Sequence, residues 1–382
     1  MEEKYHYKKD IGPENFIFIL VFFALFGILG AKMGVSNMIM TIINTSYSLL
    51  IEVCLYILAM SVIAGALSAV FSEFGFISII DKVLSFFMMP LYGLPGAASL
   101  GVLNCYLSDN PSILTLASEA NFLSYFKKYQ LPALTNLGTS FGMGLIVTTT
   151  MIGLPIEGAA KGALIGNLGA IIGSIVSVRL MLHFTKKVYG VSAQVEVKGL
   201  NEIPKDMRKI REGTAFTRLI EALLKGGAQG VKMGVAIIPG VLIICSLVMI
   251  LTHGSGSDGL YDGSAYQGIP LLPWIGDKLS PILQPLFGFS NNDGISVVIT
   301  SLGSAGAALG VVKQMAAETM INAKDIAVFT SICMCWSGYL STHIAMMDAL
   351  NTREVTSKAI FSHTIGGITA GIAANLIYKL LG

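Results

Sequence analysis

Apolar stretches long enough to cross a lipid bilayer dominate the chain. A spanning helix needs about 20 mostly apolar residues. Segments of this length lie at 15–33, 47–72, 134–154, 160–183, 230–252, 325–350 and 359–380. The pattern therefore predicts an all-α polytopic membrane protein with about seven transmembrane helices.

Two further apolar stretches, about 96–124 and about 294–320, are each broken near the middle. Ser108-Asp109-Asn110-Pro111 interrupts the first, and Gly303-Ser304-Ala305-Gly306 interrupts the second. Each stretch is too short for two spans, so we expect re-entrant hairpins, with one broken span each as the alternative. Non-helical backbone at that depth must be packed in protein or line a wet cavity.

The chain repeats itself. Pro90-Leu91-Tyr92-Gly93-Leu94 recurs as Pro285-Leu286-Phe287-Gly288-Phe289, and a hairpin, a polar-studded segment and a glycine-rich segment follow each copy. Such an internal repeat is typical of transporters built from two related halves. The predicted parts are an N-terminal tail with a peripheral helix (1–46), repeat 1 (47–183), a linker (184–229) and repeat 2 (230–382).

Basic residues suggest an orientation. Lys and Arg are frequent in the linker 184–229, whereas the polar loop 252–270 has none. The positive-inside rule then places the N-terminus and linker inside and the C-terminus outside, in a bacterial-type cytoplasmic membrane. Each repeat has an odd number of spans, so repeat 2 should be inverted. Within the linker we expect one amphipathic helix over Glu202 to Lys225, on the cytoplasmic face of the membrane.

Composition agrees with a membrane location. Apolar residues make up 53% of the chain and charged residues 13%, against about 25% charged in soluble domains. A net charge of +2 gives no reason to expect a nucleic-acid partner. The five cysteines lie in apolar segments and are interpreted as buried thiols.

Polar residues at the tip of hairpin one are the first candidates for a binding site: Asn104, Ser108, Asp109 and Asn110. Polar groups at mid-membrane depth are costly, which makes them functional candidates. Asp109 would need a cation, a substrate donor or a proton nearby. The alternative is structural, because Ser-Asp-Asn-Pro is also a good start for the hairpin's second arm.

Further candidates follow in both repeats. Ser304 lies at the tip of hairpin two, and Thr342 and His343 lie in the span after it. Thr148, Thr149 and Thr150 form a mid-span run whose oxygens suit a sodium ion if the helix unwinds there; otherwise the hydroxyls bond back to their own helix. His343 is interpreted as the only histidine deep in a span, able to bind substrate, carry a proton or ligate a metal.

Other chemistries find less support. Cys105, Cys335 and His343 form an alternative set of ligands for a transition metal. Without a nucleophile–base arrangement or an HExxH signature, an enzyme is not expected, and no phosphate-binding loop indicates nucleotide hydrolysis.

Two short motifs resemble the nucleoside-recognition (Gate) superfamily, which includes concentrative nucleoside transporters and the membrane core of ferrous-iron transport B proteins. Ser304-Ala305-Gly306-Ala307-Ala308-Leu309 is similar to the Ser-Ala-Pro-Ala-Ala-Leu tip of the transporters' second hairpin, and Leu107 to Pro111 is similar to their Gln-Thr-Glu-x-Pro-like first tip. The resemblance implies that Ser108 and Asp109 face a nucleoside and that Thr148 to Thr150 lie near a sodium site. The span after hairpin two departs from it: Cys335 to Tyr339 replaces an Asn-Glu-Phe-Val-Ala-type motif.

The sequence therefore predicts a secondary transporter that moves a small polar metabolite, such as a nucleoside, with Na⁺ or H⁺. We expect a dimer or trimer in the bilayer. The alternatives are a transition-metal transporter, and a non-transporting scaffold that binds a protein partner through the linker 184–229.

Overall fold

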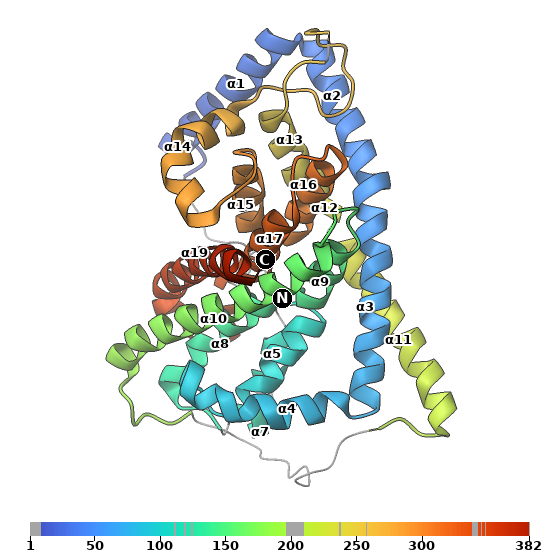
Figure 1. Ribbon diagram of the computed structural model, residues 1–382. Coiled ribbons are helices and arrows are strands. Elements are labelled where there is room, and N and C mark those ends of the chain that lie inside the picture. The colour runs from blue at the N-terminus through green and yellow to red at the C-terminus, as the bar shows by residue number, and fades with distance from the viewer. Residues whose placement is uncertain are drawn as a thin grey trace.

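The computed structural model describes residues 9–381, apart from 111, 118–119, 124, 196–209, 237, 257, 338–342, 345 and 348. Over these residues the chain is built of helices, as Figure 1 shows. The protein is an all-α polytopic membrane protein, as the apolar pattern predicts.

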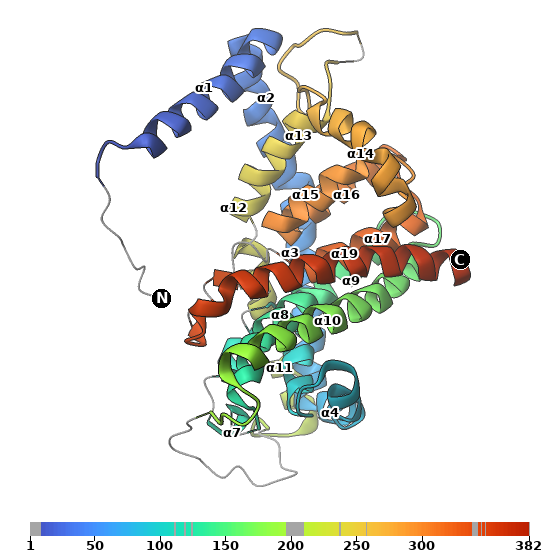
Figure 2. The ribbon, with the colours of Figure 1, turned by 90° about the vertical axis from the view of Figure 1, so that its left-hand side faces the viewer.

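The N-terminal helices form one side of the molecule. α1 (Pro13–Met33) is apolar along its length and exposes most of its side chains. Figure 2 shows it directed away from the other helices. A turn at Gly34 leads into α2 (Val35–Ser48), which continues through the π-helical turn η1 (Leu49–Cys54) into α3 (Leu55–Glu73). The exposed apolar surface of α1 is suited to contact with lipid or with another subunit.

The rest of repeat 1 follows the predicted order. α4 exposes large apolar side chains and precedes hairpin one, whose arms α5 and α6 pack on each other. The elements are α4 (Phe76–Phe87), η2 (Met88–Tyr92), α5 (Ala98–Leu107), α6 (Ser112–Ala117), α7 (Ala120–Leu123), η3 (Lys128–Gln130), α8 (Leu131–Phe141), α9 (Gly144–Ile152) and α10 (Ala159–Tyr189).

Repeat 2 has the same series. Hairpin two consists of α15 and α16, which pack on each other, and α14 precedes it as α4 precedes hairpin one. The elements are α11 (Ala215–Ala236), α12 (Ile238–Gly240), η4 (Val241–Cys245), α13 (Ser246–Thr252), α14 (Leu271–Phe287), α15 (Gly294–Gly303), α16 (Ala305–Ala317), α17 (Ala323–Cys335), η5 (Arg353–Val355) and α19 (Thr356–Leu381).

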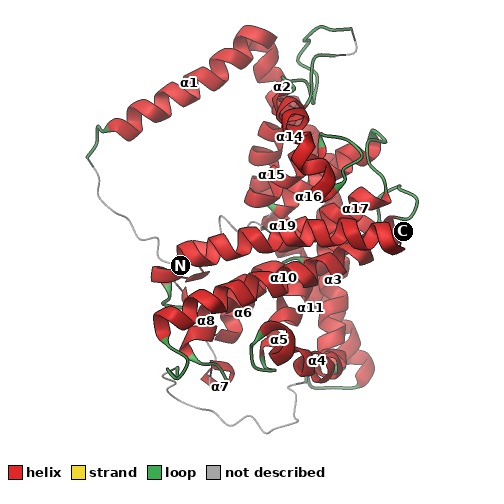
Figure 3. Cartoon of the chain, turned by 60° about the vertical axis from the view of Figure 1, so that its left-hand side comes forward, coloured by secondary structure: helices red, strands yellow, loops and turns green. Residues whose placement is uncertain are grey.

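The long helices α10 and α19 lie side by side (Figure 3). Gly169 contacts Ala374, whereas Gly173 contacts Gly366. Residue numbers along the contact rise in α10 and fall in α19, so the two helices are antiparallel. A Cβ atom on Gly173 would lie 2.4 Å from the Gly366 carbonyl oxygen, and one on Gly366 would lie 2.8 Å from that of Gly173. Small residues permit this close approach between membrane helices.

A second antiparallel pair joins α3 to α11. A Cβ atom on Gly65 would lie 2.4 Å from the carbonyl oxygen of Gly226, and one on Gly226 would lie 2.3 Å from that of Gly65. Gly230 and Gly234 continue the stripe on α11. α10 and α19, the last helices of the two repeats, thus run in opposite directions, as an inverted duplication requires.

Only some predicted spans are single uninterrupted helices. Among the described residues, three helices are long and apolar enough to cross a membrane: Pro13–Met33, Ala159–Tyr189 and Arg353–Leu381. The predicted span 134–154 is divided into α8 and α9, and 230–252 contains the end of α11 with α12, η4 and α13. Composition predicts the total apolar length of each span but not the positions at which its helix is interrupted.

The linker differs from its prediction. α10 continues to Tyr189, and α11 begins at Ala215. A single helix over 202–225 is therefore wrong, because 210–214 are not helical, while 196–209 lie outside the described residues. α11 also packs along α3 instead of lying on the surface alone. Glycines at every fourth residue of α11 form a surface for contact with another helix. They explain why α11 packs against α3 and is not a solvated surface helix.

Loops group at two ends of the molecule. At one end, the N–H of Lys128 donates to the carbonyl oxygen of Ala193, and the Tyr189 hydroxyl donates to Glu354. At the other, residues 155–158 lie near 319–324 and Tyr378. The predicted topology requires that loops on the same side of the membrane lie at the same end of the molecule. Which group faces the cytoplasm stays a prediction.

Candidate functional site

The tip of hairpin one is a compact turn that its own polar groups stabilise. The Ser108 N–H and hydroxyl both donate to the carbonyl oxygen of Asn104, at 3.0 and 2.6 Å. The Asp109 carboxylate accepts the N–H of Asn110 at 2.7 Å, and the Asp109 carbonyl accepts the N–H of Ser112 at 3.0 Å. Ser108 and Asp109 therefore shape the turn, and both remain partly exposed.

Hairpin one packs its tip onto α8 where that helix ends. A Cβ atom on Gly138 would lie 2.9 Å from a methyl group of Ile113, and one on Gly142 would lie 2.9 Å from the Cβ of Asn110. Met143 then adopts φ +56°, a left-handed conformation that breaks the helix before α9 begins. The break thus lies directly under the hairpin tip.

The two repeats meet at this break. Asn110 is buried, and its Nδ2 donates to the carbonyl oxygen of Ser337, just beyond α17, at 3.4 Å. The Ser337 hydroxyl donates to the carbonyl oxygen of Thr139 in α8 at 3.1 Å. Hairpin one, the end of α8 and the end of α17 therefore share one polar junction. Ser337 and Thr139 were missed by sequence reasoning, because a small hydroxyl residue in a span is usually bonded within its own helix.

The junction extends to His343, which is fully buried. Its Nδ1 lies 3.5 Å from the Thr139 hydroxyl oxygen. The interpretation of His343 as the only deep histidine is wrong: His363 in α19 is also fully buried, and the two ring centroids lie 4.8 Å apart. His363 falls within the predicted span 359–380, near the start of that segment. Thr342 lies outside the described residues.

The threonine run is not unwound. Thr148, Thr149 and Thr150 are helical within α9, and the break precedes them at Gly142 and Met143. The Thr149 hydroxyl donates to the carbonyl oxygen of Leu145 at 2.8 Å, the back-bonded arrangement that sequence left open. The buried Thr150 hydroxyl has no hydrogen-bond partner within the structure.

Thr148 joins hairpin one to α10. Its hydroxyl lies 3.2 Å from that of Tyr106 in α5 and accepts the Asn167 side-chain amide of α10 at 2.9 Å. Tyr106 also covers Gly144, where a Cβ atom would lie 2.2 Å from its ring. Thr148 thus holds elements together, and the sodium role predicted for the run stays a prediction.

At the tip of hairpin two, Ser304 is the N-cap of α16. Its hydroxyl accepts the N–H of Ala307 at 3.2 Å. α16 packs on both α9 and α17, so hairpin two borders the same break from the opposite repeat.

The alternative metal ligands are engaged elsewhere. The Cys105 thiol donates to the carbonyl oxygen of Asn110 at 3.4 Å, and that of Cys335 faces the carbonyl oxygen of Ala170 at 3.7 Å. In the part of the chain that the structure describes, no group of three or more His, Cys, Asp or Glu side chains could hold a metal ion.

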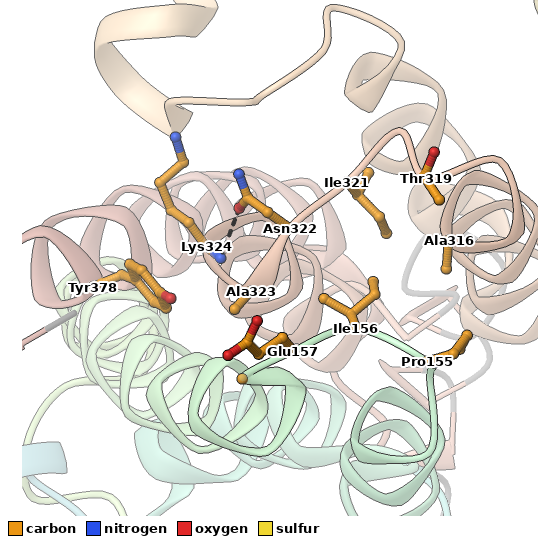
Figure 4. Close-up of a pocket in the computed structure, with 11 residues that line it drawn as sticks. Pro155, Ile156, Glu157, Ala316, Thr319, Ile321, Asn322, Ala323, Lys324 and Tyr378 are labelled. Atoms are coloured by element: carbon orange, nitrogen blue, oxygen red, sulfur yellow. Dashed lines mark hydrogen bonds between the residues drawn. The ribbon is translucent and has the colours of Figure 1, made fainter.

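A cavity of about 740 Å³ opens at the end of the molecule that the topology places outside. Figure 4 shows Glu157, from the loop after α9, and Lys324, from the start of α17, on its wall. Tyr378 of α19 lines the same cavity. The cavity therefore lies where loops of the two repeats meet at this end of the molecule.

Comparison with known proteins rests on structure. No known protein family and no curated protein sequence matches this chain. Solved structures of CNTnw, a concentrative nucleoside transporter, do match. The fold is that of a concentrative nucleoside transporter. A doubly substituted CNTnw in an outward-facing state covers 97% of this chain and 85% of its own, with a TM-score of 0.58 and 15% identity.

Other states of CNTnw align as well. The inward-facing, substrate-bound structure covers 84% of this chain and 74% of its own, with a TM-score of 0.53 and 15% identity. A substituted CNTnw in an intermediate state covers 85% and 76%, with a TM-score of 0.54 and 16% identity. At such identities the comparison shows the fold, and the protein is integral to a membrane.

Proposed function

We propose that the protein is a secondary transporter of a nucleoside or similar small polar metabolite, which works by alternating access between its repeats. The polar junction of Asn110, Ser337 and Thr139 carries this proposal. It joins a hairpin tip to two helix ends at the interface between the repeats. Broken helices at such an interface are where transporters of this build bind substrate and coupling ion.

The candidate substrate groups are those nearest the junction. Asn110 and His343 are buried beside it, and Ser108 and Asp109 are the partly exposed groups of the hairpin tip. Asn104, Ser304 and Thr342 complete the proposed set. An amide, a carboxylate and an imidazole suit the hydroxyls and ring nitrogens of a nucleoside, because each offers a directed hydrogen bond.

Several finer features belong to the same proposal. Na⁺ or H⁺ is the coupling ion, the N-terminus is inside, the C-terminus is outside, and the membrane is a bacterial-type cytoplasmic membrane. The chain forms a dimer or trimer, for which the exposed apolar face of α1 offers a contact surface. Membership of the wider nucleoside-recognition superfamily also stays part of the proposal.

Uptake by the purified full-length chain in liposomes tests the function. Labelled purine and pyrimidine nucleosides are supplied outside, with and without imposed Na⁺ or pH gradients. Gradient-driven uptake of at least one nucleoside is expected. Absence of uptake and exchange, together with no thermal shift from any nucleoside, contradicts the substrate assignment. Recovery of a protein complex through residues 184–229 would then favour the scaffold.

A further inference from the structure

Two buried histidines lie in contact at the interface between the repeats. The rings of His343 and His363 have centroids 4.8 Å apart and planes 37° apart, and both side chains are fully buried. Both belong to repeat 2, yet their Nδ1 atoms face Thr139 and Ser177, which belong to repeat 1. A group that binds across this interface can sense relative movement of the repeats.

Hydrogen bonds fix the tautomer of His363. Its Nε2 contacts the carbonyl oxygen of Cys335, which only accepts, so Nε2 carries a hydrogen. The Nδ1 of this neutral ring is then an acceptor, and the Ser177 hydroxyl donates to it at 2.9 Å. Asn136 holds that hydroxyl in place by donating its Nδ2 to Ser177 Oγ at 3.0 Å. His363 is therefore held neutral in this arrangement.

The group that faces Nδ1 of His343 is an acceptor, whereas the group that faces Nδ1 of His363 is a donor. The Thr139 hydroxyl donates its single hydrogen to the carbonyl oxygen of Thr135 at 2.9 Å. It thus presents a lone pair to His343 Nδ1, 3.5 Å away, and this favours a hydrogen on that nitrogen. An acceptor facing the ring suits a protonated imidazole, so His343 is the member of the pair that is set to gain a proton.

The pair holds one positive charge at most. Two imidazolium rings in contact, buried away from water, would repel each other strongly. A metal does not fit between them either, because both nitrogens of His363 are engaged by Ser177 and the Cys335 carbonyl. One proton per pair is the stoichiometry that this geometry allows.

Among the described residues, other titratable groups lie on the elements that pack around the pair. From α17, the Cys335 thiol faces Ala170, and the Tyr92 hydroxyl of η2 bonds to Ser174, about one turn from Ser177 on α10. From α19, Lys358 is exposed at the start of the helix. Thr139 of α8, Ser177 of α10 and Cys335 of α17 contact ring nitrogens of the pair through hydroxyl or carbonyl oxygens.

We propose that His343 carries the coupling proton of the transport cycle and that His363 is a positioning residue that limits the pair to one charge. This inference rests on the proposed transport function and names its coupling ion. A proton moves onto His343 from one side and leaves to the other side as the repeats change their relative position. No bond other than N–H forms or breaks.

The test uses liposomes with the full-length chain, labelled nucleosides, and either sodium-free buffers with a pH difference or a Na⁺ gradient at constant pH. For one proton per substrate at zero membrane potential, a pH difference of one unit drives about tenfold accumulation. His343→Asn is expected to lose accumulation driven by the pH difference, and any exchange of internal for external nucleoside that remains should no longer depend on pH, because the proton carrier is absent. His183→Asn, at an exposed position of α10, is the matched control and should accumulate like the wild type.

Ser177→Ala gives a readout that a purely structural role would not move. Without the hydroxyl donor to Nδ1, the neutral form of His363 is less favoured, so half-maximal uptake should shift to higher pH. An unshifted pH profile overturns the positioning role. Accumulation by His343→Asn, or wild-type accumulation driven by Na⁺ and indifferent to pH, overturns the proton carrier while leaving transport in place. A wild type that neither exchanges nor accumulates any nucleoside overturns the proposed function itself.

Discussion

Asn110, at the tip of hairpin one, donates a hydrogen bond to the carbonyl oxygen of Ser337, at the end of α17. These residues lie 227 positions apart in the chain and belong to different repeats. The bond ties the hairpin of one repeat to the broken helix of the other. Any movement that opens the junction must break it.

Asn110→Ala should slow nucleoside uptake. The substitution removes the donor to Ser337 and leaves its buried carbonyl without this bond, which costs about 1–3 kcal/mol. We expect uptake to fall about tenfold while the protein still folds. Initial rates in liposomes, with melting temperatures in detergent, measure the two effects. Unchanged uptake would show that the bond does not contribute to the cycle.

Gly142→Ala should destabilise the junction. The added Cβ atom would lie 2.4 Å from Ser337 Oγ and 2.9 Å from the Cβ of Asn110. Overpacking of this kind costs about 1–3 kcal/mol. Gly27→Ala in α1 is the control, because no atom lies within 4 Å of the new methyl group. A melting temperature for Gly142→Ala equal to that of Gly27→Ala would contradict the packing described for this break.

Two neighbouring glycines of α11 should respond in opposite ways. In Gly230→Ala the new Cβ atom would lie 2.2 Å from the carbonyl oxygen of Ser61, and backbone cannot move aside. In Gly227→Ala the nearest atom is a Val62 methyl group at 3.5 Å, an ordinary contact. We expect marked loss of stability for the first and up to about 1 kcal/mol of gain for the second. Thermal unfolding of both variants measures the difference, and equal stabilities would mean that α3 and α11 are not in contact.

Asp109→Ala should reduce uptake at least about tenfold, because a hydrogen bond to a charged group contributes about 1.5–3 kcal/mol. The carboxylate is the acidic group at the tip of hairpin one and also shapes the turn. Asp109→Asn keeps the turn's acceptor and separates shape from charge. Asp258→Ala, in an exposed loop, serves as the control. Full uptake in Asp109→Ala removes this residue from the site.

Single cysteines test the orientation. Cysteine at Lys324, on the wall of the large cavity, should react with a membrane-impermeant maleimide added to intact cells. Cysteine at Lys128, beside Ala193 at the other end, should react only after the membrane is opened. Of the five background cysteines, Cys54, Cys105, Cys333 and Cys335 are buried and should react little. The reverse labelling pattern would invert the proposed topology.

The fold was largely predictable because apolar length and repetition are properties of the linear chain. Both hairpins and the two glycine-rich helices α10 and α19 lie where the pattern placed them. The pattern failed at 210–229, because a polar composition hid glycines that pack α11 on α3.

The candidate site was predictable only in part. Asn110 and His343 were identified because a polar side chain at membrane depth stands out in an apolar segment. Ser337, Thr139 and His363 were missed, because their roles depend on a helix break that joins distant segments. The break was expected at Thr148 to Thr150. It occurs at Gly142 and Met143, because hydroxyl groups can bond back to their own helix whereas a left-handed residue cannot continue one.

The reciprocal glycine contact between α10 and α19 has a consequence for the symmetry of the chain. Gly173 approaches the carbonyl of Gly366 as Gly366 approaches that of Gly173, and each glycine lies in the last helix of its repeat. Such mutual contact is the property of an isologous interface, in which one surface pairs with a copy of itself. At α10 and α19 the two halves of one chain therefore meet as the subunits of a two-fold symmetric dimer do.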